Sequence, residues 1–410
     1  MVEGAKWCGK TTTAEQQAKS ILYMDQPKDR AMNLQLAQIN PDLLLKGETP
    51  RLIDEWQIAP ELWDAVRFTV DHREDEGQFI LTGSVTPLQD EDTGDSENVQ
   101  KIFHSGAGRI ARLKMRPMTL WESGDSSGQI SLEALFGGAE NMMGINQQEL
   151  QDIAWLICRG GWPRAVNQSK EIALGRAFDY YDTVVNVDIK EPDGVERDPE
   201  RVKLLMRSYA RNQGTQVSLT AICADMKAND RDTLDDRTVY SYLKALKGIF
   251  VVEDVKAWNP NLRSKSAIRS SDTRYFTDPS IAVAALGIGP ADLMSDLNTM
   301  GLFFETLCMR DLRVYAQALD GEVYHYRDSD GLECDAVVHL RNGSYGLIEM
   351  KLGGETLIQE GAKSLQKLAK KIDTSKMKSP AFLMVLTATG KYAFRREDGI
   401  WVVPIGTLKD

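Results

Sequence analysis

An α/β fold divided into more than one domain is predicted by three observations. A glycine-rich motif and three short apolar stretches near the amino end are typical of a parallel sheet. Residues 146–190 carry apolar side chains at spacings of three and four, which indicates helices. The last third of the chain has alternating apolar and polar residues on both sides of a tight turn, which indicates strands. The 410 residues suffice for two or three domains.

The composition is that of an ordinary globular protein. Hydrophobic residues make up 42% of the chain and charged residues 27%, which excludes disordered and fibrous classes. No apolar run approaches the roughly 18 residues of a membrane span. The chain shows no secretory signal and its five cysteines form no regular framework, so we expect the reducing cytoplasm. The net charge of -11 disfavours a broadly basic surface, although one local patch could still bind nucleic acid.

The motif near the amino end fits G-x-x-x-x-G-K-T at every fixed position. Its residues are Gly4, Ala5, Lys6, Trp7, Cys8, Gly9, Lys10 and Thr11. The glycines let backbone N–H groups surround phosphate oxygens, and a helix predicted over residues 12–22, starting at Thr12, would point its positive end at them. Lys10 would reach the β- and γ-phosphates, and the Thr11 hydroxyl would bind Mg²⁺. The motif predicts a site for ATP and Mg²⁺; the alternative is a glycine-rich turn.

A second element, over residues 51–57, helps to distinguish ATPases from the kinases and GTPases that share such a motif. It is a short apolar strand that ends in the adjacent acids Asp54 and Glu55. Asp54 would bind Mg²⁺ through a water, and Glu55 would orient and deprotonate an attacking water. This pair favours hydrolysis over a kinase reaction. The alternative is a solvated strand end, which its position after the glycine-rich motif disfavours.

Two further stretches supply candidates for the same site. Residues 78–84 form a predicted strand that ends in Thr82 and Ser84, whose hydroxyl groups could bind a water or the γ-phosphate. Residues 108–116 include Arg109, whose guanidinium could stabilise charge on the transferred phosphoryl group. An ordinary basic surface is the alternative for this second stretch.

These motifs, with residues 115–118 and the Gly-Gly-Trp-Pro run at 160–163, resemble the prokaryotic AAA-type ATPases whose C-terminal half is a domain of unknown function. The resemblance spans essentially the whole chain. It implies a Walker A motif with Lys10 and Thr11, a Walker B motif with Asp54 and Glu55, and sensor 1 near Ser84. It also implies a lid contact with the nucleotide at Trp162 and Pro163, and it carries over Arg109 as the candidate arginine finger.

The chain departs from that pattern at its start. A phosphate loop normally follows a buried central strand of about five apolar residues, whereas only Val2 and Glu3 lie between Met1 and Gly4. The first strand is therefore predicted to be truncated. Either the true start lies upstream, or the sheet lacks its central strand, which would weaken nucleotide binding.

The middle of the chain is predicted to be helical. Acidic stretches at 71–76 and 90–97 indicate loops, residues 123–192 a helical lid, and the Glu-Pro-Asp-Gly run at 191–194 a boundary. A helix over residues 235–247, followed by a strand, a loop and a strand, resembles a winged helix. The loop at 256–274 carries five basic residues and one acid, so it could contact phosphates. A solvated wing, or one that grips a protein, is the alternative.

A second carboxylate constellation is predicted in the last third. A helix from residue 301 carries Glu305 on its apolar face, and strands at 332–338 and 346–351 carry Asp335, Glu349 and Lys351. This ordered set resembles the PD-(D/E)xK restriction-endonuclease-like fold, in which acids hold Mg²⁺ and the lysine assists the attacking water. The alternative is a relic, a salt-bridge cluster in a domain that binds DNA or protein without cleavage. A lysine-rich run at 363–378 could contact phosphates, or be a solvated helix face.

The predicted domains are therefore 1–122 (AAA-type P-loop core), 123–192 (helical lid), 193–288 (winged-helix-like) and 289–410 (nuclease-like). The first functional hypothesis is an ATPase coupled through the winged helix to the nuclease-like region and acting on DNA or another nucleic acid. The alternative is a nucleotide-dependent switch or scaffold that binds a protein partner. A small-molecule kinase is disfavoured by Glu55. A homo-oligomer is compatible with either hypothesis, and no membrane partner is expected.

Overall fold

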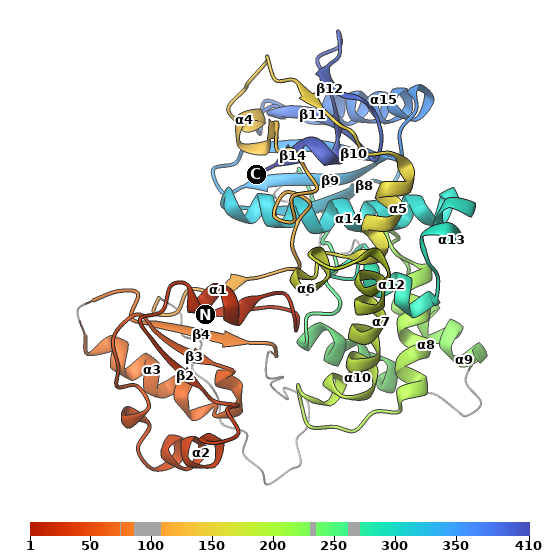
Figure 1. The fold of residues 1–410 in the computed structure, drawn as a ribbon. Helices are drawn as coiled ribbons and strands as arrows, with labels where there is room; N and C mark the ends of the chain where they lie inside the picture. The colour runs from red at the N-terminus through yellow and green to blue at the C-terminus, as the bar shows by residue number, and fades with distance from the viewer. Residues whose placement is uncertain (74, 86–107, 230–234, 261–270) are drawn as a thin grey trace. The chain divides into compact units, whose positions relative to one another are not determined.

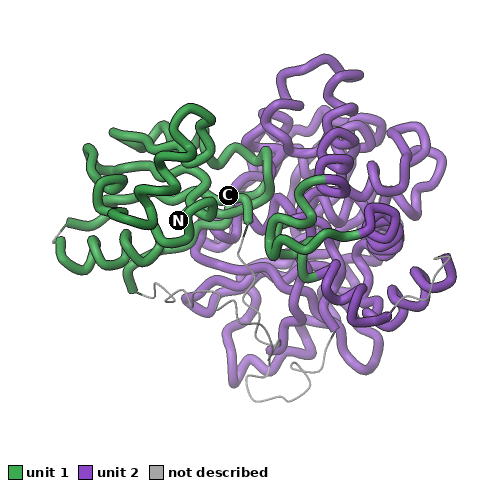
Figure 2. The backbone as a smooth tube through the Cα atoms, turned by 90° about the horizontal axis from the view of Figure 1, so that it is seen from below, with its two compact units in different colours: residues 1–116, 187–197, 244–250 green, residues 117–186, 198–243, 251–410 purple. Residues whose placement is uncertain are grey.

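The structure is a computed structural model that describes the chain except residues 74, 86–107, 230–234 and 261–270 (Figure 1). The chain divides into two compact units (Figure 2). The amino-terminal unit contains residues 1–116, 187–197 and 244–250, and the carboxyl-terminal unit contains residues 117–186, 198–243 and 251–410. Among the helices of the described residues, none is long and apolar enough to cross a membrane.

The amino-terminal unit is built on a five-stranded sheet in the order β2-β3-β4-β1-β5. Every neighbouring pair of strands is parallel, as the sequence predicts. The strands are β1 (Val2–Glu3), β2 (Ser20–Tyr23), β3 (Arg51–Asp54), β4 (Phe79–Gly83) and β5 (Leu113–Lys114). Because parallel strands end at a common edge, the residues that follow β1, β3 and β4 meet there.

The central strand is present but short. β1 has two residues and pairs with β4 on one side and with β5 on the other. Val2 lies opposite Thr82, and Glu3 lies opposite Gly83. Since Gly4 follows directly, the phosphate loop begins at the carboxyl end of this strand. The sheet therefore keeps its central strand, at less than the usual length.

The helix after the phosphate loop is shorter than predicted. α1 (Lys10–Glu15) ends well before residue 22, and residues 20–23 form β2. The prediction of a helix over residues 12–22 is thus wrong in its second half. β2 pairs with β3 over four residues, with Ile21 opposite Leu52. The apolar residues at 21–23 fit a strand as well as a helical face, and pairing with a neighbouring strand decides between the two.

A hydrophobic core lies beneath this sheet. It joins the buried parts of β3 and β4 to α2 (Arg30–Ile39) and α3 (Glu61–Asp71). Its largest members are Trp56 and Trp63, whose ring centroids are 5.1 Å apart. The core holds β3 and β4 in fixed register, which positions the side chains that follow them.

The carboxyl-terminal unit begins with helices, as predicted for the middle of the chain. They are α4 (Leu132–Phe136), α5 (Leu150–Arg159), α6 (Pro163–Val166), α7 (Lys170–Asn186), α8 (Pro199–Arg211), α9 (Leu219–Asn229), α10 (Asp236–Gly248), α12 (Pro279–Leu286) and α13 (Pro290–Ser295), of which α10 ends in the other unit. After α10, Val252 pairs with Phe276 and Val255 with Thr273 in antiparallel bridges. The predicted winged helix stays a prediction, and much of its basic loop, like the acidic stretch at 90–97, lies outside the described residues.

The same unit contains a mixed seven-stranded sheet in the order β7-β12-β13-β11-β10-β9-β8. Its strands are β7 (Gly144–Ile145), β8 (Gly321–Arg327), β9 (Glu333–Leu340), β10 (Tyr345–Lys351), β11 (Phe382–Thr387), β12 (Tyr392–Arg395) and β13 (Trp401–Pro404). A separate pair, β6 (Ile130–Ser131) and β14 (Leu408–Lys409), is parallel.

The predicted hairpin is confirmed within this sheet. β9 and β10 are antiparallel, with Leu347 opposite Val337. α14 (Leu297–Ala318) and α15 (Glu355–Lys371) lie beside these strands in Figure 1. α14 starts four residues earlier than predicted, because Asp296 caps its first turn by accepting hydrogen bonds from the backbone N–H groups of Asn298 and Thr299.

Candidate functional site

The phosphate loop joins β1 to α1, and two of its glycines are required by its geometry. A side-chain carbon on Gly4 would lie 1.9 Å from the backbone oxygen of Met115. Gly9, which precedes α1, has a φ of 101°, and Trp7 has a φ of 68°. Left-handed residues of this kind turn successive N–H groups toward a common point, which forms a concave site for an anion. The loop therefore has a shape suited to a phosphate.

Lys10 is folded onto this loop. Its side chain is buried, and Nζ donates hydrogen bonds to the backbone oxygens of Gly4 at 3.0 Å and Ala5 at 2.9 Å. An ammonium group held between carbonyl oxygens keeps its charge within the loop. A triphosphate bound in the loop would offer this group stronger, negatively charged acceptors.

Asp54 connects the two predicted motifs. Its Oδ1 accepts a hydrogen bond from Thr11 Oγ1 at 2.8 Å, and it also accepts one from the Thr82 hydroxyl. The second bond follows from the sheet, because Asp54 and Thr82 are register partners on β3 and β4. The predicted Mg²⁺ ligands Thr11 and Asp54 are thus brought together, with Thr82 beside them.

Glu55 lies one residue beyond β3, with a left-handed φ of 54° that is unusual for a glutamate. Its Oε2 accepts a hydrogen bond from Gln57 Nε2 and a longer one, 3.4 Å, from Ser84 Oγ. Burial raises the pKa of Glu55 above its ordinary value, although the bond from Gln57 acts to lower it. A carboxylate with a raised pKa is better suited to accept a proton near neutral pH. Sequence reasoning had missed Gln57, whose only signal is its spacing of two from Glu55.

Arg109 is not brought to this site. It pairs with Asp71, at the carboxyl end of α3. Arg109 precedes β5, whose Leu113 lies opposite Val2 at the start of β1. Arg109 therefore lies toward the amino edge of the sheet, whereas the phosphate loop leaves the carboxyl edge. The role of Arg109 as an arginine finger, in the same subunit or toward a neighbouring one, stays a prediction.

The Gly-Gly-Trp-Pro run belongs to the core of the carboxyl-terminal unit. Trp162 is buried, and its Nε1 donates a hydrogen bond to Ser280 Oγ at 2.9 Å. The centroids of the Trp162 and Tyr180 rings are 4.2 Å apart. Gly161 N donates to Asp278 Oδ2 at 2.9 Å. Pro163 is the first residue of α6, a position that favours proline. Packing accounts for these residues, and the predicted lid contact of Trp162 and Pro163 with the nucleotide stays a prediction.

The second predicted constellation assembles in the carboxyl-terminal unit. Lys351 Nζ lies 2.8 Å from Glu349 Oε2 and 3.3 Å from Asp335 Oδ2. Asp335 Oδ2 also accepts a hydrogen bond from Met350 N at 2.7 Å. Burial, followed by the charge of Asp335, raises the pKa of Glu305 well above its usual range.

Lys351 is the cation of this cluster. Burial acts to lower its pKa, but the charges of Asp335 and Glu349 outweigh that effect and raise it. Among the described residues, no group of three His, Cys, Asp or Glu side chains is placed to hold a metal ion. In this arrangement one ammonium group pairs with two carboxylates.

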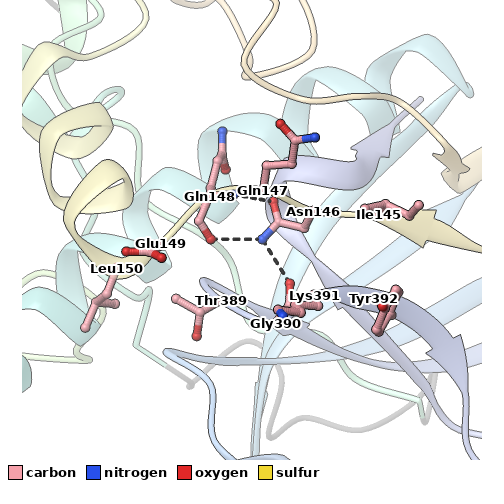
Figure 3. Close-up of a pocket in the computed structure, with 10 residues that line it drawn as sticks. All are labelled: Ile145, Asn146, Gln147, Gln148, Glu149, Leu150, Thr389, Gly390, Lys391 and Tyr392. Carbon is pink, nitrogen blue, oxygen red and sulfur yellow. Dashed lines mark hydrogen bonds between the residues drawn. The ribbon is translucent and has the colours of Figure 1, made fainter.

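A pocket of about 530 Å³ lies elsewhere in the same unit, lined by residues 145–150 and 389–392 (Figure 3). Asn146 joins the two segments that line the pocket, because its Nδ2 donates hydrogen bonds to the backbone oxygens of Gln148 at 3.1 Å and Gly390 at 3.0 Å. The predicted site residues are absent from its lining, so it is separate from both constellations.

Comparisons with known proteins indicate the class of the amino-terminal region. Residues 1–123 match the family described as an AAA domain. Residues 150–292 and 300–408 match two domains of unknown function, DUF8612 and DUF4143. A solved structure, the Walker-type ATPase PABY2304 of Pyrococcus abyssi, is similar to 69% of this chain and 89% of its own at 13% identity, with a TM-score of 0.36. No curated protein matches. The amino-terminal region is an AAA-family P-loop ATPase domain, followed by two regions of unknown function.

Proposed function

We propose that this chain binds ATP with Mg²⁺ at the phosphate loop and hydrolyses it. The observation that carries the proposal is the 2.8 Å hydrogen bond between Thr11 and Asp54, which joins the two motifs at one edge of the sheet. The match of residues 1–123 to an AAA domain supports the same class of activity.

The residues present fit a magnesium ion. Thr11 supplies a hydroxyl oxygen and Asp54 a carboxylate oxygen, and Mg²⁺ in nucleotide sites takes one or two such protein ligands together with phosphates and water. The ion would neutralise charge on the phosphates. Thr82, through its bond to the Asp54 carboxylate, would keep that ligand oriented.

The other residues take complementary roles in the proposal. Lys10 would exchange the Gly4 and Ala5 carbonyls for the β- and γ-phosphate oxygens, while the N–H groups of the loop enclose the phosphates. Glu55 would accept the proton of the attacking water, and Ser84, which contacts the same carboxylate, would orient that water.

Phosphate release from Mg·ATP tests the proposal. The unmodified chain should release phosphate. Glu55→Gln should bind ATP but release phosphate roughly a hundredfold more slowly. Lys10→Ala should lose both ATP binding and phosphate release. Glu15→Gln, on the same α1 helix, is the matched control and should keep most of the activity. Equal release by the unmodified chain and Glu55→Gln would contradict the assignment of the base.

We propose, second, that the carboxyl-terminal region is nuclease-like and acts on nucleic acid under control of the ATPase domain. The supporting observation is that the carboxylates of Asp335 and Glu349 both lie within 3.3 Å of the amine of Lys351, the residue predicted in one set with them. With Lys351 between the carboxylates the set does not fit an open metal site, so we derive no cleavage step from it. A domain that binds nucleic acid or a protein without cleavage, in a nucleotide-dependent switch, is the alternative.

Incubation of DNA or RNA with Mg²⁺ or Mn²⁺ separates these alternatives. Cleavage by the unmodified chain that is lost in Lys351→Ala supports a nuclease. Identical, uncut substrate in both samples supports the binding role, and a gel-shift assay with and without ATP then shows whether nucleic acid is the partner.

A further inference from the structure

One side chain of the phosphate loop makes contacts that phosphate binding does not explain. Lys6 occupies a variable position of the motif, and its Nζ lies 2.8 Å from Asp188 Oδ1 and 3.2 Å from Glu191 Oε1. All three residues belong to the amino-terminal unit, although the two acids lie more than 180 positions away in the sequence. The loop is therefore tied to the segment 187–197.

This segment is a stiff element. It begins with a 3₁₀ turn, Asp188–Lys190, and Gly194 N donates to Lys190 O at 2.7 Å. The side chain of Arg197 is buried and donates to the backbone oxygens of Ile189 at 3.0 Å and Val195 at 3.1 Å. Because these bonds fix the backbone, the carboxylates that face Lys6 lose little further freedom when they pair with it.

The ion pair with Asp188 is shielded from water. The side chain of Asp188 is 3% exposed, and that of Lys6 is 36% exposed. Burial acts to lower the pKa of Lys6, but the hydrogen bond and charge of Asp188, with those of Glu191, raise it. The lysine is thus charged, and its removal would leave a nearly buried carboxylate without its cation, which is costly in a protein interior.

The contact acts on the part of the loop that most needs support. Lys6 directly precedes Trp7, which has the left-handed φ of 68°. A bulky residue in that conformation is strained and persists only where its surroundings hold it. The same conformation helps turn the N–H groups toward the phosphate position.

We propose that Asp188 and Glu191 are positioning residues that act through Lys6 to hold the phosphate loop in its nucleotide-binding shape. The inference rests on the proposed binding of ATP and adds a coupling between that binding and the segment 187–197. Because coupling between two elements is reciprocal, bound nucleotide stabilises the segment 187–197. That segment joins the end of α7 at Asn186 to the start of α8 at Pro199, so nucleotide occupancy reaches the helical region through it.

Calorimetric titration of the full chain with Mg·ATPγS tests the affinity. Lys6→Gln and Asp188→Asn should each weaken binding about tenfold. The double variant should bind no more weakly than Lys6→Gln alone, because Lys6→Gln already removes the contacts of the lysine with both acids. Lys6→Arg, which can keep the ion pair, should bind almost as well as the unmodified chain. Lys190→Gln is the matched control, since Lys190 lies in the same segment and pairs with the exposed Glu196.

Hydrogen exchange supplies a readout that a merely structural contact would not change. Mg·ATPγS should slow amide exchange within residues 187–197 of the unmodified chain and of Lys190→Gln, but not of Asp188→Asn at saturating nucleotide. Unchanged affinity in Lys6→Gln and Asp188→Asn would overturn the inference while leaving ATP binding intact. No binding by the unmodified chain would instead overturn the proposed function, and the inference with it.

Discussion

The hydroxyl of Thr11 donates a hydrogen bond of 2.8 Å to the carboxylate of Asp54. The two residues lie on different elements, the first turn of α1 and the end of β3, and meet because both elements reach the same edge of the sheet. Asp54 is buried and also bonded by Thr82, so its oxygen is held in place without a ligand. The fold itself thus holds the two residues that we propose as magnesium ligands.

Asp54→Asn should lower ATP hydrolysis roughly a hundredfold, because an amide is a poor ligand for Mg²⁺. The fold should survive, since an amide oxygen can still accept the bond from Thr11. Phosphate release at saturating Mg·ATP measures the effect, with the exposed Asp42→Asn as control. A rate for Asp54→Asn equal to that of the control would contradict the magnesium assignment.

The acid limb of the ATPase pH profile should be set by Glu55. Because the pKa of Glu55 is raised, protonation of its carboxylate should begin to lower the rate at a higher pH, as the pH is decreased, than protonation of an ordinary glutamate would. The bond from Gln57 lowers that pKa, so Gln57→Leu should move the acid limb to still higher pH. Measurement of kcat from pH 5 to 8 checks this. An acid limb that Gln57→Leu leaves in place would show that another group controls it.

Asp278→Ala should strongly destabilise the carboxyl-terminal unit. Asp278 Oδ2 lies 2.9 Å from Arg310 Nη1, and both side chains are fully buried. After removal of the Asp278 carboxylate, Arg310 keeps, among the described residues, only Asp311 as a carboxylate partner. The buried N–H groups of Gly161 and Ser280 also lose their acceptor, and together these losses cost about 3–5 kcal/mol. Urea unfolding measures the loss. Lys203→Ala, which breaks an exposed pair with Glu200, should cost about 0.5 kcal/mol or less, and a similar small effect for Asp278→Ala would be the contrary result.

His325 should make the carboxyl-terminal unit less stable in mild acid. Burial lowers the pKa of His325 to about 4, and its Nδ1 lies 3.1 Å from Gln216 Nε2. Between that pKa and the ordinary value of about 6.5, the unfolded chain binds more protons than the folded one, so stability falls as pH falls through this window. The loss attributable to His325 approaches about 3 kcal/mol near pH 4.

Urea unfolding at pH 7.5 and pH 5 measures this contribution. The free energy of unfolding should change less between these pH values in His325→Gln than in the unmodified chain. His72→Gln, at an exposed position, is the control and should change as much as the unmodified chain. Equal pH dependence in the unmodified chain and His325→Gln would refute the assignment.

The sequence predicts those parts of the site whose chemistry is local. A phosphate loop needs its glycines, lysine and threonine at fixed spacing, so residues 4–11 are recognisable without the fold. The hairpin of Asp335, Glu349 and Lys351 is equally local. The end of α1 cannot be predicted locally, because residues 20–23 fit both a helical face and a strand. Their pairing with β3 makes them a strand.

Contacts between distant residues leave still weaker signals. Nothing near Lys6 in the sequence indicates Asp188, and nothing near Arg109 indicates that it would pair with Asp71 at the other edge of the sheet. The motif around Trp162 predicts a nucleotide contact, but it carries no signal of the bond from Trp162 to Ser280, which depends on the packing of the helices. Such contacts follow from the fold rather than from local preference.

Calorimetric titration of the full chain with Mg·ATP tests the central claim most directly. The account predicts saturable binding at one site per chain, weakened at least about tenfold by Lys10→Ala, which should remain folded by circular dichroism. Absence of heat from binding in the folded, unmodified chain, or equal affinity in Lys10→Ala, would contradict it.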